Sequence, residues 1–118
     1  MQHIDEQTLT KLRQAPAPQS FRLIDFDSAE VRPGFVPNTF FLIVTGTVPC
    51  ANMRVELIPV VYIQRPDYWE IEVVAFLPGP ICLPQVRQYT ETLPLDGILG
   101  TAGIEVVGAT RKERIGVP

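Results

Sequence analysis

Few residues of this chain combine the type and spacing that catalysis needs. Glu70 and Glu72 lie two positions apart in an alternating stretch, which on one strand face would set their carboxylates roughly 6.5–7 Å apart. That separation falls within the range used by inverting glycoside hydrolases. Alternating glutamates are also common on any solvated strand face, so a carboxylate-dependent hydrolase is the third of the functions considered.

Other catalytic groups are scarce. His3 is the single histidine of the sequence and lies near its start, where a chain end is usually poorly ordered. A cysteine nucleophile needs a base beside it, and His3 is the only imidazole that either cysteine could use. We therefore assign no catalytic residue and favour a non-catalytic protein, with no cofactor.

Two cysteines, Cys50 and Cys82, each lie in a proline-flanked segment at the end of an apparent strand. In a reducing compartment the default interpretation is two free, buried thiols. The alternative is a disulfide between them, which requires Cα atoms about 4.4–6.8 Å apart. A zinc site is not expected, because the chain has no Cys-x-x-Cys pair and only one histidine.

Three aromatic residues gather in a short stretch, Tyr62, Tyr68 and Trp69. On a β-sheet such side chains either pack across strands near a turn or offer a surface for sugar rings. A small-ligand or carbohydrate site at these aromatics is the second function considered.

The elements that would position these groups are strands. Apolar and β-branched residues recur in short runs, and the twelve prolines fall where the runs stop. We predict an all-β domain, an antiparallel sandwich or partly open barrel of six or seven strands. The expected strands lie at 20–27, 40–44, 53–57, 69–74, 85–93 and 103–109. A short helix is expected at 5–14, a Pro-rich linker up to residue 19, the sandwich at 20–110 and a charged solvated tail at 111–118.

The middle of the chain predicts a hairpin with its turn at 65–67. If Gln64 opposes Tyr68, one face of the pair is almost wholly apolar and belongs to the core. The opposite face carries charged residues together with an unexpected apolar cluster, Ile58, Val60, Val74 and Phe76. Pro59 lacks a ladder donor, which places its strand at a bulge or an edge.

This outer cluster is the main functional hypothesis. It predicts an interface, most simply a two-fold homodimer, with docking of another protein as an alternative. The N-terminal helix or a loop of the same chain could also cover it, or it could line a ligand groove. The sequence therefore predicts a non-catalytic interaction or assembly module.

Composition limits the partners. The net charge is −3 and the pI about 5.0, whereas nucleic-acid binding needs clustered Lys and Arg. The first fifteen residues lack the apolar core of a secretory signal, and the apolar runs are far shorter than the roughly 20 residues of a membrane helix. We expect no nucleic acid, no membrane and a cytoplasmic location.

Overall fold

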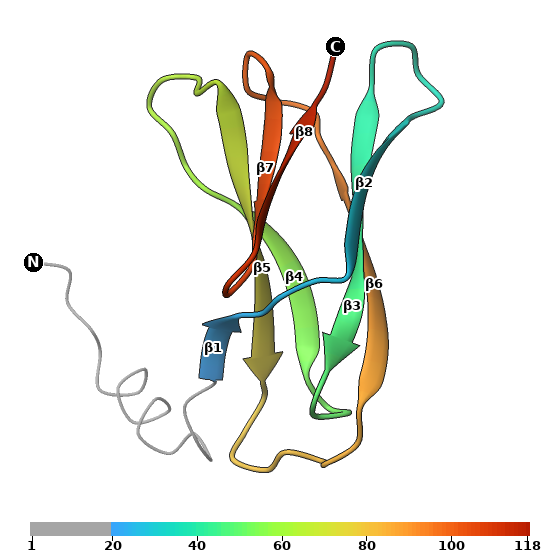
Figure 1. Ribbon diagram of the computed structural model, residues 1–118, viewed down its shortest axis with the longest axis vertical. Coiled ribbons are helices and arrows are strands. Elements are labelled where there is room, and N and C mark those ends of the chain that lie inside the picture. Colours follow the sequence, from blue (N-terminus) through green and yellow to red (C-terminus); the bar gives the residue numbers. More distant parts are fainter. Residues whose placement is uncertain (1–19) are drawn as a thin grey trace, which may run out of the picture.

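The computed structural model describes residues 20–118 and shows eight strands in two packed sheets, with no helix in this range (Figure 1). The prediction of an all-β sandwich is confirmed. The predicted helix at 5–14 and the linker that follows it lie outside the described residues. The strands are β1 (Ser20–Leu23), β2 (Ser28–Pro33), β3 (Phe40–Val48), β4 (Arg54–Pro59), β5 (Tyr68–Leu77), β6 (Arg87–Pro94), β7 (Gly103–Val107) and β8 (Lys112–Gly116).

Strand β5 organises the larger, five-stranded sheet. It pairs with β4 along one side, while its other side pairs with β7 in its first half and with β1 in its second half. The β5–β7 pair is parallel, and β8 completes the sheet by pairing antiparallel with β7. The smaller sheet has the order β2-β3-β6 and is antiparallel throughout.

The core lies between the two sheets and follows from the alternation of each strand. In β3, β4 and β5, every second residue is buried, as expected for strands with one wet face. Within residues 20–118 no polar or charged residue is buried except the largely apolar Tyr89. The largest fully buried side chains are Leu42, Val44, Val48, Ile71, Val73, Leu95, Ile104 and Val106.

The β4–β5 pair differs from the predicted hairpin by two residues in register. Arg54 opposes Phe76 and Pro59 opposes Ile71, so the division into a core face and an outer face is as expected, because a two-residue shift preserves it. The strand ends at Pro59, and Val61 and Ile63 are almost completely exposed in the following loop rather than in the core.

The reason is that β4 and β5 form the predicted hairpin through a long loop, and residues 65–67 do not form its tight turn. The carbonyl oxygens of Pro66 and Asp67 accept hydrogen bonds from the amides of Thr101 and Ala102, and Arg65 donates to the carbonyl of Leu99. The β4–β5 loop is thereby drawn onto the β6–β7 loop. A Cβ on Gly100 would lie 2.3 Å from the Asp67 carbonyl oxygen, which explains why a glycine stands at this contact.

The expected first strand is divided. Strand β1 ends at Leu23, the Ile24 amide still bonds to the Val73 carbonyl, and the chain then crosses to the smaller sheet, where it forms β2 instead of a loop. The crossing is held by side chains from the β7–β8 turn: Asp25 accepts from Thr110, and Arg111 donates to the carbonyls of Phe26 and Asp27.

The predicted solvated tail contains a strand instead. Residues Lys112–Gly116 form β8, in which Ile115 packs against the core while Arg114 pairs with Glu105, with 2.9 Å between Nε and Oε2. Lys112 and Arg114 occupy exposed positions of this edge strand, whereas Glu113 shares the face of Ile115, is half-buried and pairs with Arg111 at 2.8 Å.

Three edge strands, β2, β4 and β6, end in a proline: Pro33, Pro59 and Pro94. In each, the residue after the proline donates its amide to the neighbouring chain segment. Because successive residues of an antiparallel strand face alternate sides, the nitrogen of the proline itself points away from that neighbour. Each missing N–H therefore falls on the free side of the sheet. The bonds that establish this are Gly34 to Thr39, Val60 to Glu70 and Leu95 to Phe40.

Candidate functional site

The two glutamates singled out for hydrolysis lie on the outer face of the larger sheet. Glu70 accepts a hydrogen bond from the Tyr62 hydroxyl at 3.0 Å, and Glu72 opposes Ile58 across the β4–β5 ladder. Neither residue lines either of the two surface hollows described below. His3 lies outside the described residues, and within residues 20–118 no three His, Cys, Asp or Glu side chains gather as metal ligands would.

The groups with shifted pKa values hold the fold together. Hydrogen bonds from the Thr110 hydroxyl, and then from its amide, lower the pKa of Asp25. Burial raises the pKa of Tyr62, with a contribution from its bond to Glu70. Burial also raises the pKa of Tyr89 to about 12, and the Tyr89 hydroxyl donates to the Asp25 carbonyl at 3.2 Å. Each shift therefore has a structural cause.

The three predicted aromatics do not form one surface. Tyr62 and Trp69 pack edge to face with ring centroids 5.3 Å apart, and the Trp69 indole N–H donates to the Val60 carbonyl. The guanidinium carbon of Arg114 lies over the Tyr68 ring, 4.5 Å from the centroid of that ring. A ligand site at this end stays a prediction, reduced to Tyr62 and Trp69 beside a hollow of about 420 Å³ that Arg65 also lines.

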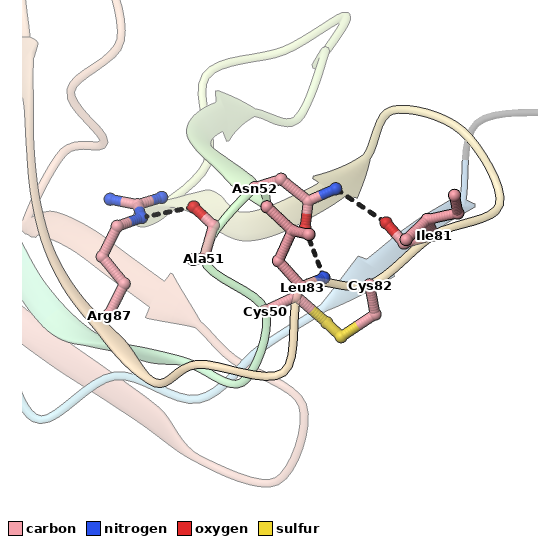
Figure 2. Close-up of a disulfide and its surroundings, with 7 residues drawn as sticks. All are labelled: Cys50, Ala51, Asn52, Ile81, Cys82, Leu83 and Arg87. Atoms are coloured by element: carbon pink, nitrogen blue, oxygen red, sulfur yellow. Dashed lines mark hydrogen bonds between the residues drawn. A yellow bond between two sulfur atoms is a disulfide. The ribbon is translucent and has the colours of Figure 1, made fainter.

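Cys50 and Cys82 form a disulfide, with their Cα atoms 5.2 Å apart, rather than two free thiols (Figure 2). Cys50 lies in the β3–β4 crossing and Cys82 in the β5–β6 crossing, so the bond joins two segments that each pass between the sheets. Asn52 reinforces it by bonding to both neighbours of Cys82, the Ile81 carbonyl at 2.7 Å and the Leu83 amide at 3.1 Å.

The predicted outer cluster is present, but its composition changes. With the register shifted, Ile58 opposes Glu72, and the amide of Val60 bonds to Glu70, so these two residues lie beside glutamates rather than beside Val74 and Phe76. Strand β1 extends the cluster on the other side of β5. We define the outer patch as Phe21, Leu23, Ile58, Val74 and Phe76.

Phe21 and Phe76 form the centre of the outer patch. They oppose one another across the β1–β5 ladder, and their rings meet edge to face with centroids 4.6 Å apart. Leu23 opposes Val74 in the next row. Phe21 remains 61% exposed, whereas Ile24 and Phe26, which follow it in the chain, are buried.

Phe21 and Leu23 were not predicted to belong to the outer cluster. In the predicted strand 20–27 they alternate with Arg22, Ile24 and Phe26, and both sets are partly apolar. Alternation alone cannot decide which set faces the core. Arg22 does not decide it either. An arginine usually marks the wet face, but Arg22 lies on the core side, opposite Ala75, and remains exposed at the sheet margin.

Other exposed apolar side chains lie on loops. Phe35 and Val36 follow β2, and Val61 and Ile63 follow β4, at the same end of the sandwich (Figure 1). Ile81, Leu83 and Val86 surround the disulfide in the β5–β6 segment. A second hollow of about 420 Å³ lies beside Phe35 and is lined by Phe41, Pro94 and Asp96 among others. Only the outer patch stands on paired strands.

Within residues 20–118 the chain contains no helix long and apolar enough to cross a membrane. No family model, curated protein or solved structure matches the chain, so these comparisons assign no function.

Proposed function

We propose that this chain is a non-catalytic interaction module that self-associates through the outer patch, most simply as a homodimer. The observation that carries the proposal is the Phe21–Phe76 pair, an aromatic contact on a regular sheet with Phe21 61% exposed. Contiguous apolar surface on a soluble domain is characteristic of binding sites, and aromatic side chains dominate the binding energy of interfaces.

The surroundings of the outer patch fit an interface. Arg54 and Glu56 lie on β4 beside Phe76 and Val74, and Glu72 opposes Ile58. Charged residues therefore border an apolar centre, as in protein interfaces with an apolar core and a polar rim. The opposite outer face of the molecule, on β3 and β6, carries four threonines together with the half-buried Phe41 and Ile43; the threonines are Thr45, Thr47, Thr90 and Thr92.

The compartment belongs to the same proposal. The sequence alone predicted a cytoplasmic protein, but structural disulfides persist mainly where proteins meet an oxidising environment. The Cys50–Cys82 bond supports folding in such a compartment, and we adopt this location in place of the cytoplasm.

The proposal predicts that Phe21→Glu disrupts self-association. Removing a central interface anchor costs about 2 kcal/mol or more, which corresponds to a dissociation constant raised at least about 30-fold. Light scattering coupled to gel filtration, with native mass spectrometry, measures the change across a dilution series. Circular dichroism verifies that the variant is folded.

Phe35→Glu is the matched control. Phe35 is fully exposed on the β2–β3 loop, so the same change of side chain should leave the mass unaltered. A wild-type protein that is monomeric at all concentrations, or a control that dissociates as readily as Phe21→Glu, contradicts the proposal.

A further inference from the structure

Strand β1 has a free edge with intact hydrogen-bonding groups. The Ile24 amide donates to the Val73 carbonyl at 3.0 Å, and successive residues of an antiparallel strand face alternate sides. Ser20 and Arg22 therefore bond toward β5, while the N–H and C=O groups of Phe21 and Leu23 point away from it. Within residues 20–118 these groups have no hydrogen-bond partner.

The other free edges each carry a feature that hinders strand addition, although the inner residues of β2, β4 and β6 keep their free-side N–H groups. The edges of β2, β4 and β6 each end in a proline whose absent N–H falls on the free side. Strand β8 carries Lys112 and Arg114. Prolines and charged side chains are the usual devices that prevent strand addition at an edge. Strand β1 has neither a proline nor more than one charged residue between Ser20 and Leu23.

We propose that β1 of one copy pairs antiparallel with β1 of a second copy, joining the two larger sheets into one. This inference rests on the proposed self-association and specifies its geometry. Short edge strands that add to one another use the main chain for affinity and the adjoining side chains for specificity. Here the adjoining side chain is Phe21, at the centre of the outer patch.

The side chains favour one register. If Phe21 opposed Leu23 of the second copy, Arg22 would oppose Arg22, and like charges directly across a ladder are destabilising. If Phe21 opposes Phe21 of the second copy, Arg22 lies opposite Ser20 and this repulsion is removed. Opposed residues share a face, so the two Phe21 rings meet on the outer side of the joined sheet.

This register also continues a contact already present. Phe76 packs against Phe21 within each copy at 4.6 Å between centroids. Two-fold pairing then creates a row of four aromatic rings in the order Phe76, Phe21, Phe21, Phe76 across the axis. A contact made by the same strand of both copies is isologous and closes at two copies.

Amide exchange measured by NMR on the full chain tests the geometry. Across a dilution series that spans the dimer dissociation, the Phe21 amide should exchange at least about 10-fold more slowly in the dimer, since it gains a hydrogen bond there. The Arg22 and Ile24 amides, which bond to β5 in each copy, should be protected at every concentration and serve as internal controls.

Each other outcome is decisive. If a dimer forms while the Phe21 amide exchanges equally fast at all concentrations, the copies meet face to face, and the strand pairing is wrong although the proposed function stands. If no dimer forms, both fail. If the Phe21 amide is protected in the dilute monomer, another part of the same chain covers the edge, and the pairing is wrong.

A pair of variants gives an independent test. Phe21→Ala removes the ring and keeps the N–H, whereas Phe21→Pro removes both without removing a bond to β5. We expect the proline variant to raise the dimer dissociation constant at least about 10-fold beyond the alanine variant, since each two-fold pair loses both of its Phe21 N–H donors. Continued protection of the Arg22 amide shows that β1 is still docked. Equal dissociation constants for the two variants would overturn the pairing.

Discussion

The chain holds its two sheets together in two different ways at two of its crossings. At one end, the β3–β4 and β5–β6 segments are joined by the Cys50–Cys82 disulfide. Asn52 adds side-chain bonds to the same segment, and Arg87 donates to the Ala51 carbonyl at 3.1 Å, as Figure 2 shows. We refer to this region as the covalent crossing.

The β1–β2 crossing contains no disulfide and is held by hydrogen bonds. Asp25 accepts from the Thr110 and Arg111 amides at 2.7 and 3.1 Å. Arg111 donates to the Phe26 carbonyl at 2.6 Å and lies over the Phe26 ring. The Tyr89 hydroxyl donates to the Asp25 carbonyl from the smaller sheet. We refer to this region as the polar crossing.

The comparison separates two sources of stability. A disulfide acts mainly by restricting the unfolded chain, so it is sensitive to reductant and insensitive to acid. A carboxylate that accepts several hydrogen bonds acts in the folded state, and its contribution depends on its ionisation. The covalent crossing should therefore respond to redox conditions and the polar crossing to pH.

The largest effect is expected from opening the covalent crossing. Replacing Cys50 and Cys82 by serine should lower the free energy of unfolding by about 3–4 kcal/mol, the value for a cross-link that closes a loop of this length. Urea denaturation of the variant and of the wild type, each with and without reductant, measures the loss. Equal free energies of unfolding for reduced and oxidised wild type would show that the disulfide does not stabilise this crossing.

A smaller loss is expected from crowding the polar crossing. A Cβ on Gly46 would lie within 2.5–2.7 Å of the Tyr89 ring and hydroxyl, so Gly46→Ala should displace Tyr89 from the Asp25 carbonyl. Overpacking of this kind costs about 1–3 kcal/mol. Thr47→Ala, one residue on and exposed, is the control and should lie within about 0.5 kcal/mol of wild type. Similar midpoints in urea for the two variants would show that Tyr89 moves without cost.

The smallest effect is the pH dependence of the polar crossing. The pKa of Asp25 is below its ordinary value of 3.8, so the folded state binds fewer protons than the unfolded state between the two values. The stabilisation is present above 3.8 and is lost as the pH falls through the folded-state pKa. Asp25→Asn should therefore lose less stability than wild type between neutral pH and about pH 2.

Thr110→Ala sharpens this measurement. It removes the hydroxyl that contributes most to the lowered pKa of Asp25 and leaves the carboxylate in place. Its acid dependence, followed by urea denaturation at each pH, should lie between those of wild type and Asp25→Asn. A steeper dependence than wild type would assign the pH effect to another group.

Alternation predicted the fold class and the two faces of β4 and β5, because both depend on parity alone. It did not predict the register, since a shift of two residues keeps every side chain on its face. The register depends on how residues 65–67 bond to the β6–β7 loop, a contact between distant parts of the sequence. Strand β8 was missed because Ile115 is its single large apolar residue.

The candidate site was predicted in part, because strand alternation also assigns residues to the outer face. Val74 and Phe76 were placed on the outer face by their alternation with Val73 and Ala75. Phe21 was not, because both alternating sets of residues 20–27 are partly apolar, and no local pattern marks the change of sheet that follows β1. That change depends on Asp25 reaching the turn at Thr110, 85 residues away.

The prolines that end β2, β4 and β6 limit the number of copies that can join. A sheet protein with two receptive edges can add copies without end, and such growth leads to fibres. Here three edges each lack one free-side N–H, at the last residue of the strand, and a fourth carries positive charge. A pair joined through β1 has used both of those edges, so this contact closes at two copies, and the edges that remain each carry a proline or positive charge.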